Sequence, residues 1–199
     1  MKAIFIMEGK NDLRFLRRPL GKAGYVEGNN LKVFTVYGKK NFRQHEETTM
    51  LRNFLSLDSR YSILAKIETG RDGVKSLIKV VLEQISYSYP QVSFTAMVDY
   101  DGNNPNEVKE EIADDITSAR PELTVSFKSI PLLPSIIEKS KFIIYNKADN
   151  RAIFVFCLVS FLESLEDASK ERFPGPGSNS TKVKKLSDSF CLENFINCD

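Results

Sequence analysis

Two aspartates that follow an apolar run have types and spacing suited to binding a metal ion. Residues 92–98 are mostly apolar or β-branched, and Asp99, Asp101 and Gly102 come directly after them. Parallel sheets place their ligands just beyond the carboxyl ends of such strands. Side chains two residues apart on a strand point the same way, so Asp99 and Asp101 can face one hard cation. Asp, Gly and Asn also form ordinary turns, so a simple loop is an equal alternative for this segment taken alone.

A further acid near the start of the chain favours the metal-binding interpretation. Residues 3–7 form a short apolar run that predicts a buried strand, and Glu8 and Gly9 follow it. Gly9 allows a sharp turn into an amphipathic helix that Asn11 and Asp12 open. If this strand neighbours the strand before Asp99, three carboxylates meet at one edge of a sheet. Without that neighbour, Glu8 would be a solvated residue at the end of an edge strand.

The segments IFIMEGKND and MVDYDG, in this order, resemble the Toprim domain shared by topoisomerases, bacterial primases, OLD-type nucleases and RecR-like repair proteins. The resemblance covers roughly residues 2–130. It implies a general acid/base role for Glu8 and a Mg²⁺ (or Mn²⁺) ion held by Asp99 and Asp101, with Glu8 as a further ligand. Gly102 follows the second aspartate at once, whereas many relatives place this glycine later, so the metal loop departs from the family pattern.

Absent motifs narrow the kind of relative that this chain resembles. The sequence has one histidine, three cysteines without a CxxC pair, and no Walker-A pattern. Zinc modules and an attached ATPase are therefore not expected. The resemblance is to a small stand-alone Toprim protein, nearest in kind to the OLD-type or ribosomal-RNA-maturing nucleases.

The expected function is Mg²⁺-dependent phosphoryl transfer on DNA or RNA by a nuclease or phosphodiesterase. Hard carboxylate oxygens suit Mg²⁺ or Mn²⁺, and the sequence leaves open whether one ion or two bind. A catalytically silent nucleic-acid-binding or assembly module with the same fold is the alternative. A third possibility is that the two motifs coincide by chance in an unrelated α/β protein.

Phosphate contacts are expected from basic residues and glycine-rich turns beside the acids. Two turns, 38–41 and 70–73, compete for the place next to the site, and we favour 70–73 because its helix leads directly into residues 92–99. Glu68 and Asp72 flank that turn and are as consistent with structural roles. Lys10 follows Glu8 closely and is also a candidate catalytic residue. The residues expected to contact nucleic acid are Lys10, Lys39, Lys40, Gly70 and Arg71.

The order of the predicted elements indicates the fold class. Alternating strand and helix patterns predict a Toprim-like (Rossmann-like) α/β fold, with a compact, mostly parallel sheet and helices on both faces. We expect this domain over residues 1–146, with 31–57 as a possible insertion, and a C-terminal helical extension over 147–199 packed on the same core. The apolar run 152–162 predicts a buried helix. Because that helix would be apolar on nearly every side, a homodimer interface is the alternative to core packing.

Composition limits the partners. With 28 Lys and Arg against 26 Asp and Glu, the net charge is +2, so nucleic-acid binding must come from a local patch. No apolar stretch reaches the length of a membrane span, and the short run at 3–7 is followed at once by an acid, unlike a signal peptide. We expect a cytoplasmic protein without a membrane partner.

Overall fold

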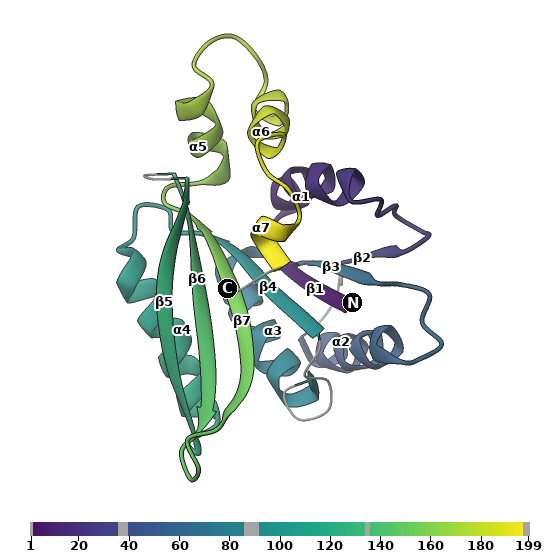
Figure 1. Ribbon diagram of the computed structural model, residues 1–199, viewed down its shortest axis with the longest axis vertical. Coiled ribbons are helices and arrows are strands. Elements are labelled where there is room, and N and C mark those ends of the chain that lie inside the picture. The colour runs from purple at the N-terminus through teal and green to yellow at the C-terminus, as the bar shows by residue number, and fades with distance from the viewer. Residues whose placement is uncertain (1, 36–39, 86–91, 134–135, 197–199) are drawn as a thin grey trace.

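Seven strands form one mixed sheet at the centre of the chain (Figure 1). The computed structural model describes residues 2–35, 40–85, 92–133 and 136–196, the side chains of 40–44, 83–85 and 131 excepted. The spatial order of the strands is β2-β3-β1-β4-β7-β6-β5. Their bounds are β1 (Lys2–Met7), β2 (Leu31–Thr35), β3 (Ile63–Ile67), β4 (Val92–Asp99), β5 (Leu123–Leu133), β6 (Ile137–Asn146) and β7 (Ala152–Phe161).

Most of the sheet is parallel. Strands β2, β3, β1, β4 and β7 run in one direction, whereas β6 is antiparallel to β7 and β5 is antiparallel to β6. The helices are α1 (Lys10–Lys22), α2 (Lys40–Leu55), α3 (Gly70–Ile85), α4 (Pro105–Ala119), α5 (Leu165–Arg172), α6 (Asn179–Ser187) and α7 (Glu193–Ile196). The predicted α/β class with a mostly parallel sheet is confirmed.

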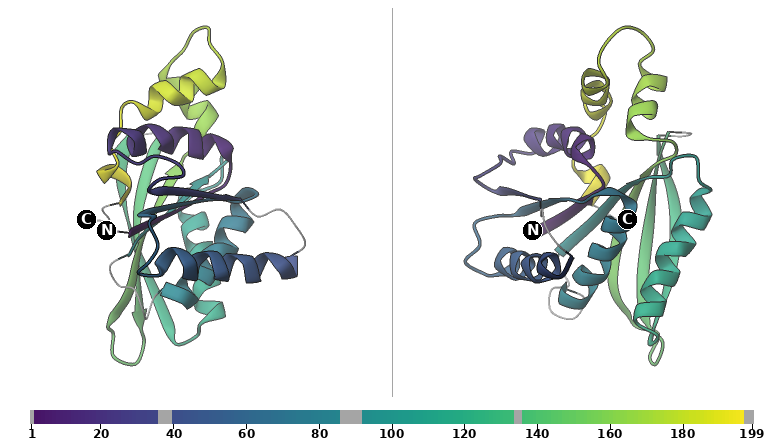
Figure 2. Two further views of the ribbon diagram at one scale, coloured as in Figure 1. Left: turned by 90° about the vertical axis from the view of Figure 1, so that its right-hand side faces the viewer. Right: turned by 180° about the vertical axis from the view of Figure 1, so that it is seen from behind.

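Helices cover both faces of the sheet, as the alternation of buried side chains along the strands requires. Ile4 and Ile6 of β1 pack in the core formed with α2, α3 and α4. Phe5 and Met7 point the other way, into the core formed with α1, α5, α6 and α7. Figure 2 shows these two layers from the side and from behind. A strand buried on both faces favours apolar residues on both sides, and this explains why β1 and β4 are mostly apolar.

Residues 152–161 form strand β7, so the prediction of a buried helix over residues 152–162 is wrong. β7 lies between β4 and β6 and pairs with both of them. A continuous apolar run fits a buried helix and a strand buried on both faces equally well, and its aromatic and β-branched residues favour the strand. The homodimer interface expected through this helix loses its basis, because the segment is buried inside the chain's own sheet.

The region 147–199, expected as a helical extension, begins with strand β7 and not with a helix. β6 ends at Asn146, and the backbone N–H of Asn146 donates to the carbonyl of Arg151 at 3.0 Å, across the turn that leads into β7. The helical part of the C-terminal region therefore begins only with α5, at Leu165. Residues 31–57, expected as an insertion, contribute β2 and α2, and β2 pairs with β3 at one margin of the sheet.

The register of the parallel strands decides which residues meet at their carboxyl ends. Met7 lies opposite Ile67 of β3 and Met97 of β4. Asp99, at the end of β4, lies opposite Phe161 of β7. Glu8 and Asp99 therefore leave neighbouring strands at the same edge. No helix in the described ranges is long and apolar enough to cross a membrane.

Truncating Phe156 tests the position of β7 in the core. Its side chain is fully buried, and its ring stacks on Phe142 with the centroids 4.7 Å apart. We expect Phe156→Ala to lower the free energy of unfolding by about 3–5 kcal/mol, because it leaves a cavity. The control Val26→Ala removes a side chain that is 57% exposed and should stay within about 0.5 kcal/mol of wild type. Denaturant unfolding measures both, and equal small effects would contradict a buried β7.

Candidate functional site

The carboxyl ends of β1 and β4 open onto a pocket of about 370 Å³. Glu8 comes from the end of β1, Asp99 from the end of β4, and Gly70 from the start of α3. The first turn of α1 and the first turn of α5 complete the wall. The lining residues are Glu8, Gly9, Lys10, Asn11, Asp12, Arg14, Gly70, Asp99 and Glu166.

Glu8 carries an unsatisfied carboxylate oxygen. Its Oε1 is buried and has no hydrogen-bond partner. Removal from water raises the pKa of Glu8 to about 7, and the charge of Asp99 adds to the increase. The backbone of Glu8 is fixed, because its carbonyl accepts a hydrogen bond of 3.3 Å from the Gly70 N–H. A buried oxygen without a partner is costly, and it marks a place where a ligand can supply the missing contact.

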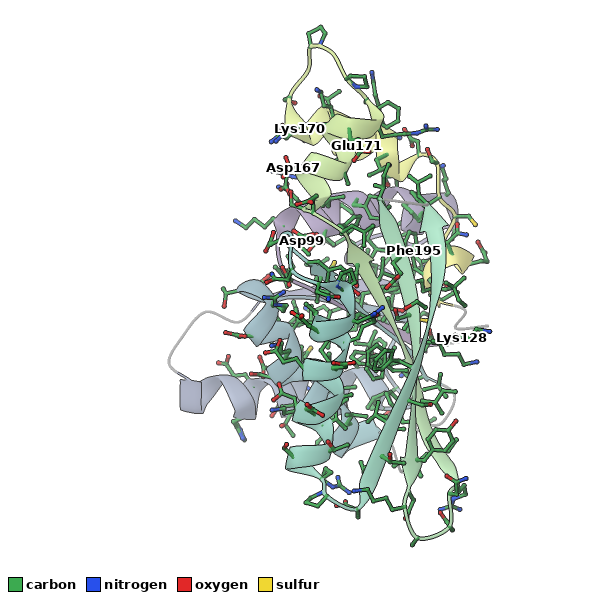
Figure 3. All side chains as sticks on the ribbon, turned by 90° about the vertical axis from the view of Figure 1, so that its left-hand side faces the viewer. Asp99, Lys128, Asp167, Lys170, Glu171 and Phe195 are labelled. Atoms are coloured by element: carbon green, nitrogen blue, oxygen red, sulfur yellow. The ribbon has the colours of Figure 1, made fainter. Side chains whose placement is uncertain are left out.

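Asp99 lies against the start of α5, and Figure 3 shows it below the part of that helix that carries Asp167 and Lys170. The Leu165 N–H donates to Asp99 Oδ1 at 3.2 Å. The side chain is half-buried. Desolvation, followed by the charge of Asp12, raises the pKa of Asp99 to about 8. The carboxyl of Asp99 thus joins the end of β4 to the N-terminus of α5.

Two acids of this pocket were not expected as site residues. Asp12 is 5% exposed, and its Oδ2 accepts from the Gly9 N–H at 3.0 Å. Burial raises the pKa of Asp12 to about 7. Glu166, on α5, accepts a hydrogen bond from the side-chain amide of Asn11. The sequence indicated Asp12 only by its position four residues after Glu8, and that position predicted the start of a helix and not a site residue. Nothing in the sequence around Glu166 indicated a site residue, because Glu166 reaches the pocket only when the preceding segment, β7, is a strand.

Asp101 occupies a different position from the one expected. It is exposed and does not line the pocket. Its backbone lies in the left-handed region, with φ 50°, and its N–H donates to the Glu163 carbonyl at 3.0 Å. Its charge still helps to raise the pKa of Glu8 and of Asp99. The structure therefore brings Glu8 and Asp99 together, with Asp101 at the margin.

Of the residues expected to contact nucleic acid, Lys10, Gly70 and Arg71 lie near the acids, whereas the side chains of Lys39 and Lys40 are not described. Lys10 is exposed and lines the pocket, and Gly70 adopts φ 76° on its opposite wall. Arg71 is half-buried, its Nη1 is buried without a hydrogen-bond partner, and its charge lowers the pKa of Glu8. Lys39 lies outside the described residues, and Lys40 begins α2 with its side chain undescribed. The turn at 70–73 thus borders the site through Gly70, whereas residues 38 and 39 of the competing turn lie outside the described part.

Glu68 and Asp72 have structural surroundings. Glu68 is 3% exposed and forms an ion pair with the buried Lys66. Asp72 carries a side chain that is 98% exposed, with its Oδ1 3.8 Å from Lys75 Nζ. Neither residue lines the pocket.

The donor set suits a hard divalent cation. Its acids are Glu8, Asp12, Asp99 and Glu166, and oxygen ligands of this kind select Mg²⁺ or Mn²⁺. Across the described ranges, no group of three or more His, Cys, Asp or Glu side chains is placed so that it could hold a metal ion. Mg²⁺ keeps several waters and takes one or two protein carboxylates, so two acids with room for water fit it. Glu8 and Asp99, which both line the pocket, are the two acids at the ends of neighbouring strands that could supply these ligands.

The comparisons with known proteins do not assign this chain to a family. No protein-family model matches the sequence, and no curated protein matches it. Among solved structures, the solution NMR structure of a de novo designed protein with a P-loop NTPase fold is similar at 20% sequence identity, with a TM-score of 0.35. The match covers 58% of this chain and 75% of the designed one. A likeness at that level carries no argument about fold or activity.

The buried acids predict how stability depends on pH in EDTA. In the folded chain the pKa of Asp12 is raised from 3.8 to about 7, so the folded state binds more protons than the unfolded state between these values. This contribution to stability is present below pH about 4 and is lost as the pH rises through about 7. Glu8 and Asp99 act in the same direction. The melting temperature should therefore fall between about pH 5 and about pH 8.

Asp12→Asn should make that fall smaller, because an amide oxygen can still accept from the Gly9 N–H and carries no charge. Glu171→Gln removes an exposed carboxylate of α5 and should keep the wild-type profile. Thermal unfolding monitored by circular dichroism measures all three proteins. An Asp12→Asn profile as steep as that of wild type would show that Asp12 is not buried as a neutral acid.

Proposed function

We propose that this protein is a Mg²⁺-dependent phosphodiesterase that cleaves nucleic acid, with Glu8 as general acid/base and Asp99 as a metal ligand. The proposal is supported first by two unsatisfied groups of opposite charge at one sheet edge. Glu8 Oε1 and Arg71 Nη1 are both buried without a hydrogen-bond partner. A cation and a phosphate at this edge would satisfy both of them. The resemblance of residues 4–12 and 97–102 to Toprim motifs supports the same reaction class.

The acids support cation binding through their mutual repulsion. Desolvation is the largest cause of the raised pKa of Glu8, Asp12 and Asp99, and the charge of a neighbouring acid adds to each, so the metal-free pocket favours neutral carboxyl groups near pH 7. A divalent cation would stabilise the ionised forms and displace their protons. When bound, it would neutralise the charge that develops on the phosphoryl oxygens during cleavage. Asp99 and Glu8 are the proposed ligands, and Asp101 is a proposed ligand through bound water at the margin.

The residues of this chain supply proton transfer and orientation. Glu8 serves either as a cation ligand or as the general acid/base, because a bound cation would hold its carboxyl group ionised. When Glu8 is not bound to the cation, its pKa of about 7 lets it both give and accept a proton near neutral pH. Arg71 offers a guanidinium that can hold phosphate oxygens, and Lys10 offers a mobile charge at the pocket mouth. Gly70 leaves the backbone side of the pocket open, since nothing lies within 4 Å of a Cβ built there.

Substitution of the two central acids tests the proposed activity. Wild-type protein should cleave labelled single- or double-stranded DNA or RNA with Mg²⁺ or Mn²⁺ and not in EDTA. Glu8→Gln and Asp99→Asn should each lower the cleavage rate by about a hundredfold or more, since each removes a group that acts in the reaction. Thermal unfolding checks that the variants fold. Glu171→Gln, an exposed acid on α5, serves as the matched control.

Equal cleavage by wild type and both variants would assign the nuclease activity to a contaminant and remove the proposal. Metal-dependent binding of nucleic acid without cleavage would favour the silent binding or assembly module instead. A preference among the four polymers would identify the substrate class.

A further inference from the structure

A second pocket of about 500 Å³ lies beside the edge strand β2, and none of its lining residues belongs to the acid pocket. It lies between β2, the end of α2 and the segment that leads into β3, near the amino-terminal end of β3. The acid pocket lies beyond the carboxyl ends of the strands. The floor is apolar and consists of Phe34, Met50, Phe54 and Leu64. Pockets of this volume with an apolar floor are typical of sites for small organic ligands.

An aromatic ring with two cations forms part of the wall. Arg60 Cζ lies 5.0 Å and Lys32 Nζ 5.7 Å from the centroid of the Tyr61 ring. Arg60 Nη2 also donates to the Tyr61 hydroxyl at 3.0 Å. Both cations are exposed, and within the described residues neither forms an ion pair with a carboxylate. Asp58 is the acidic residue of the lining, so the charged side chains of this pocket are two cations and one carboxylate.

The combination of an apolar floor, stacking planes and cations points to a particular ligand chemistry. Nucleic-acid bases stack on aromatic rings and on guanidinium planes, while Lys and Arg contact phosphate. An uncharged apolar ligand would make no use of two cations without carboxylate partners. A simple polyanion would make no use of the floor. Asn53, Ser59 and Asp58 add donors and acceptors that can contact a base edge or a sugar hydroxyl.

We propose that this pocket is a nucleotide-binding site, in which the base enters against Tyr61 and the apolar floor and the phosphate contacts Lys32 and Arg60. The choice of a nucleotide over other aromatic anions rests on the proposed function. The ligand is either a free mononucleotide or one nucleotide of a single strand. In the second case the site would hold the strand at a distance from the acids and would contribute to substrate affinity.

Binding measurements in EDTA test this site separately from cleavage. The probes are AMP, measured by calorimetric titration, and a fluorescein-labelled oligothymidylate, measured by anisotropy. We expect Tyr61→Leu, and the double variant Lys32→Gln/Arg60→Gln, each to weaken binding by roughly tenfold, the size of effect that loss of one stacked base produces. For the single strand, the double variant should also reduce the slope of log K against log salt by roughly 0.7 for each phosphate that it no longer neutralises.

Matched controls separate this site from general attraction of anions. Tyr61→Phe keeps the ring and should retain binding, and Lys128→Gln removes an exposed charge from β5, at the other margin of the sheet. Binding is measured in EDTA, without the cation that the proposed cleavage needs, so failure of one proposal does not imply failure of the other. Because Lys32 and Arg60 are exposed, their variants remain informative if Tyr61→Leu does not fold.

The pattern of binding decides between the sources and the proposal itself. Binding of AMP alone would identify a free nucleotide, and binding of the strand, with or without AMP, would identify a single-stranded substrate. Absence of binding to both probes overturns the proposal. An unchanged affinity in the ring and cation variants, or an equal loss in Lys128→Gln, overturns it as well.

Discussion

The candidate site depends on carboxyl groups that the fold holds together away from water. Glu8 and Asp99 leave neighbouring parallel strands, and Asp12 is buried on the first turn of the helix that follows β1. Each has a raised pKa, and desolvation is the largest cause in all three. Such an arrangement costs stability when the groups are ionised, and it persists because the two cores on either side of the sheet fix the strands. A cation would turn the same repulsion into a source of affinity.

The strands that carry Glu8 and Asp99 could be predicted from the sequence, because local signals agree there. The run at residues 3–7 is continuously apolar, the run at 92–98 is mostly apolar or β-branched, and both end in turn-forming residues, which is the pattern of a parallel strand buried on two faces. The segment 152–161 has the same apolar pattern, but no turn-forming residue beside it excludes a helix. Its pairing with β4 and β6 is set by contacts between residues distant in the chain. Periodicity within one segment cannot indicate such pairing.

The site itself was predictable in part for the same reason. Glu8 and Asp99 lie at the ends of strands, Lys10 and Gly70 lie at the starts of helices, and the structure places all four around one pocket. Asp12 looked like an ordinary helix start, because burial depends on what packs over it. Glu166 could not be predicted, because it lies on α5 and the position of α5 depends on the pairing of β7, the strand before it. Asp101 was expected beside Asp99, but a left-handed backbone at residue 101 breaks the alternation that a strand would impose.

The C-terminal helices have a role in the site that the expected extension did not include. The α5 N-terminus donates a hydrogen bond to Asp99, and Glu166 accepts one from Asn11 of α1. On the same face, Ser187 of α6 donates to the carbonyl of Phe15 in α1. The first helix is thus connected to α5 and to α6, and Figure 1 shows α6 beside α1. Order in α5 and the arrangement of the acids are therefore coupled.

The most direct test of the metal-binding claim is a crystal structure of the protein soaked in Mn²⁺, with anomalous diffraction recorded near the manganese edge. The account predicts an anomalous peak in the pocket within coordination distance, roughly 2.0–2.5 Å, of oxygens from both Glu8 and Asp99. Well-ordered Glu8 and Asp99 side chains without such a peak at saturating Mn²⁺, or a peak only at other surface acids, would contradict it.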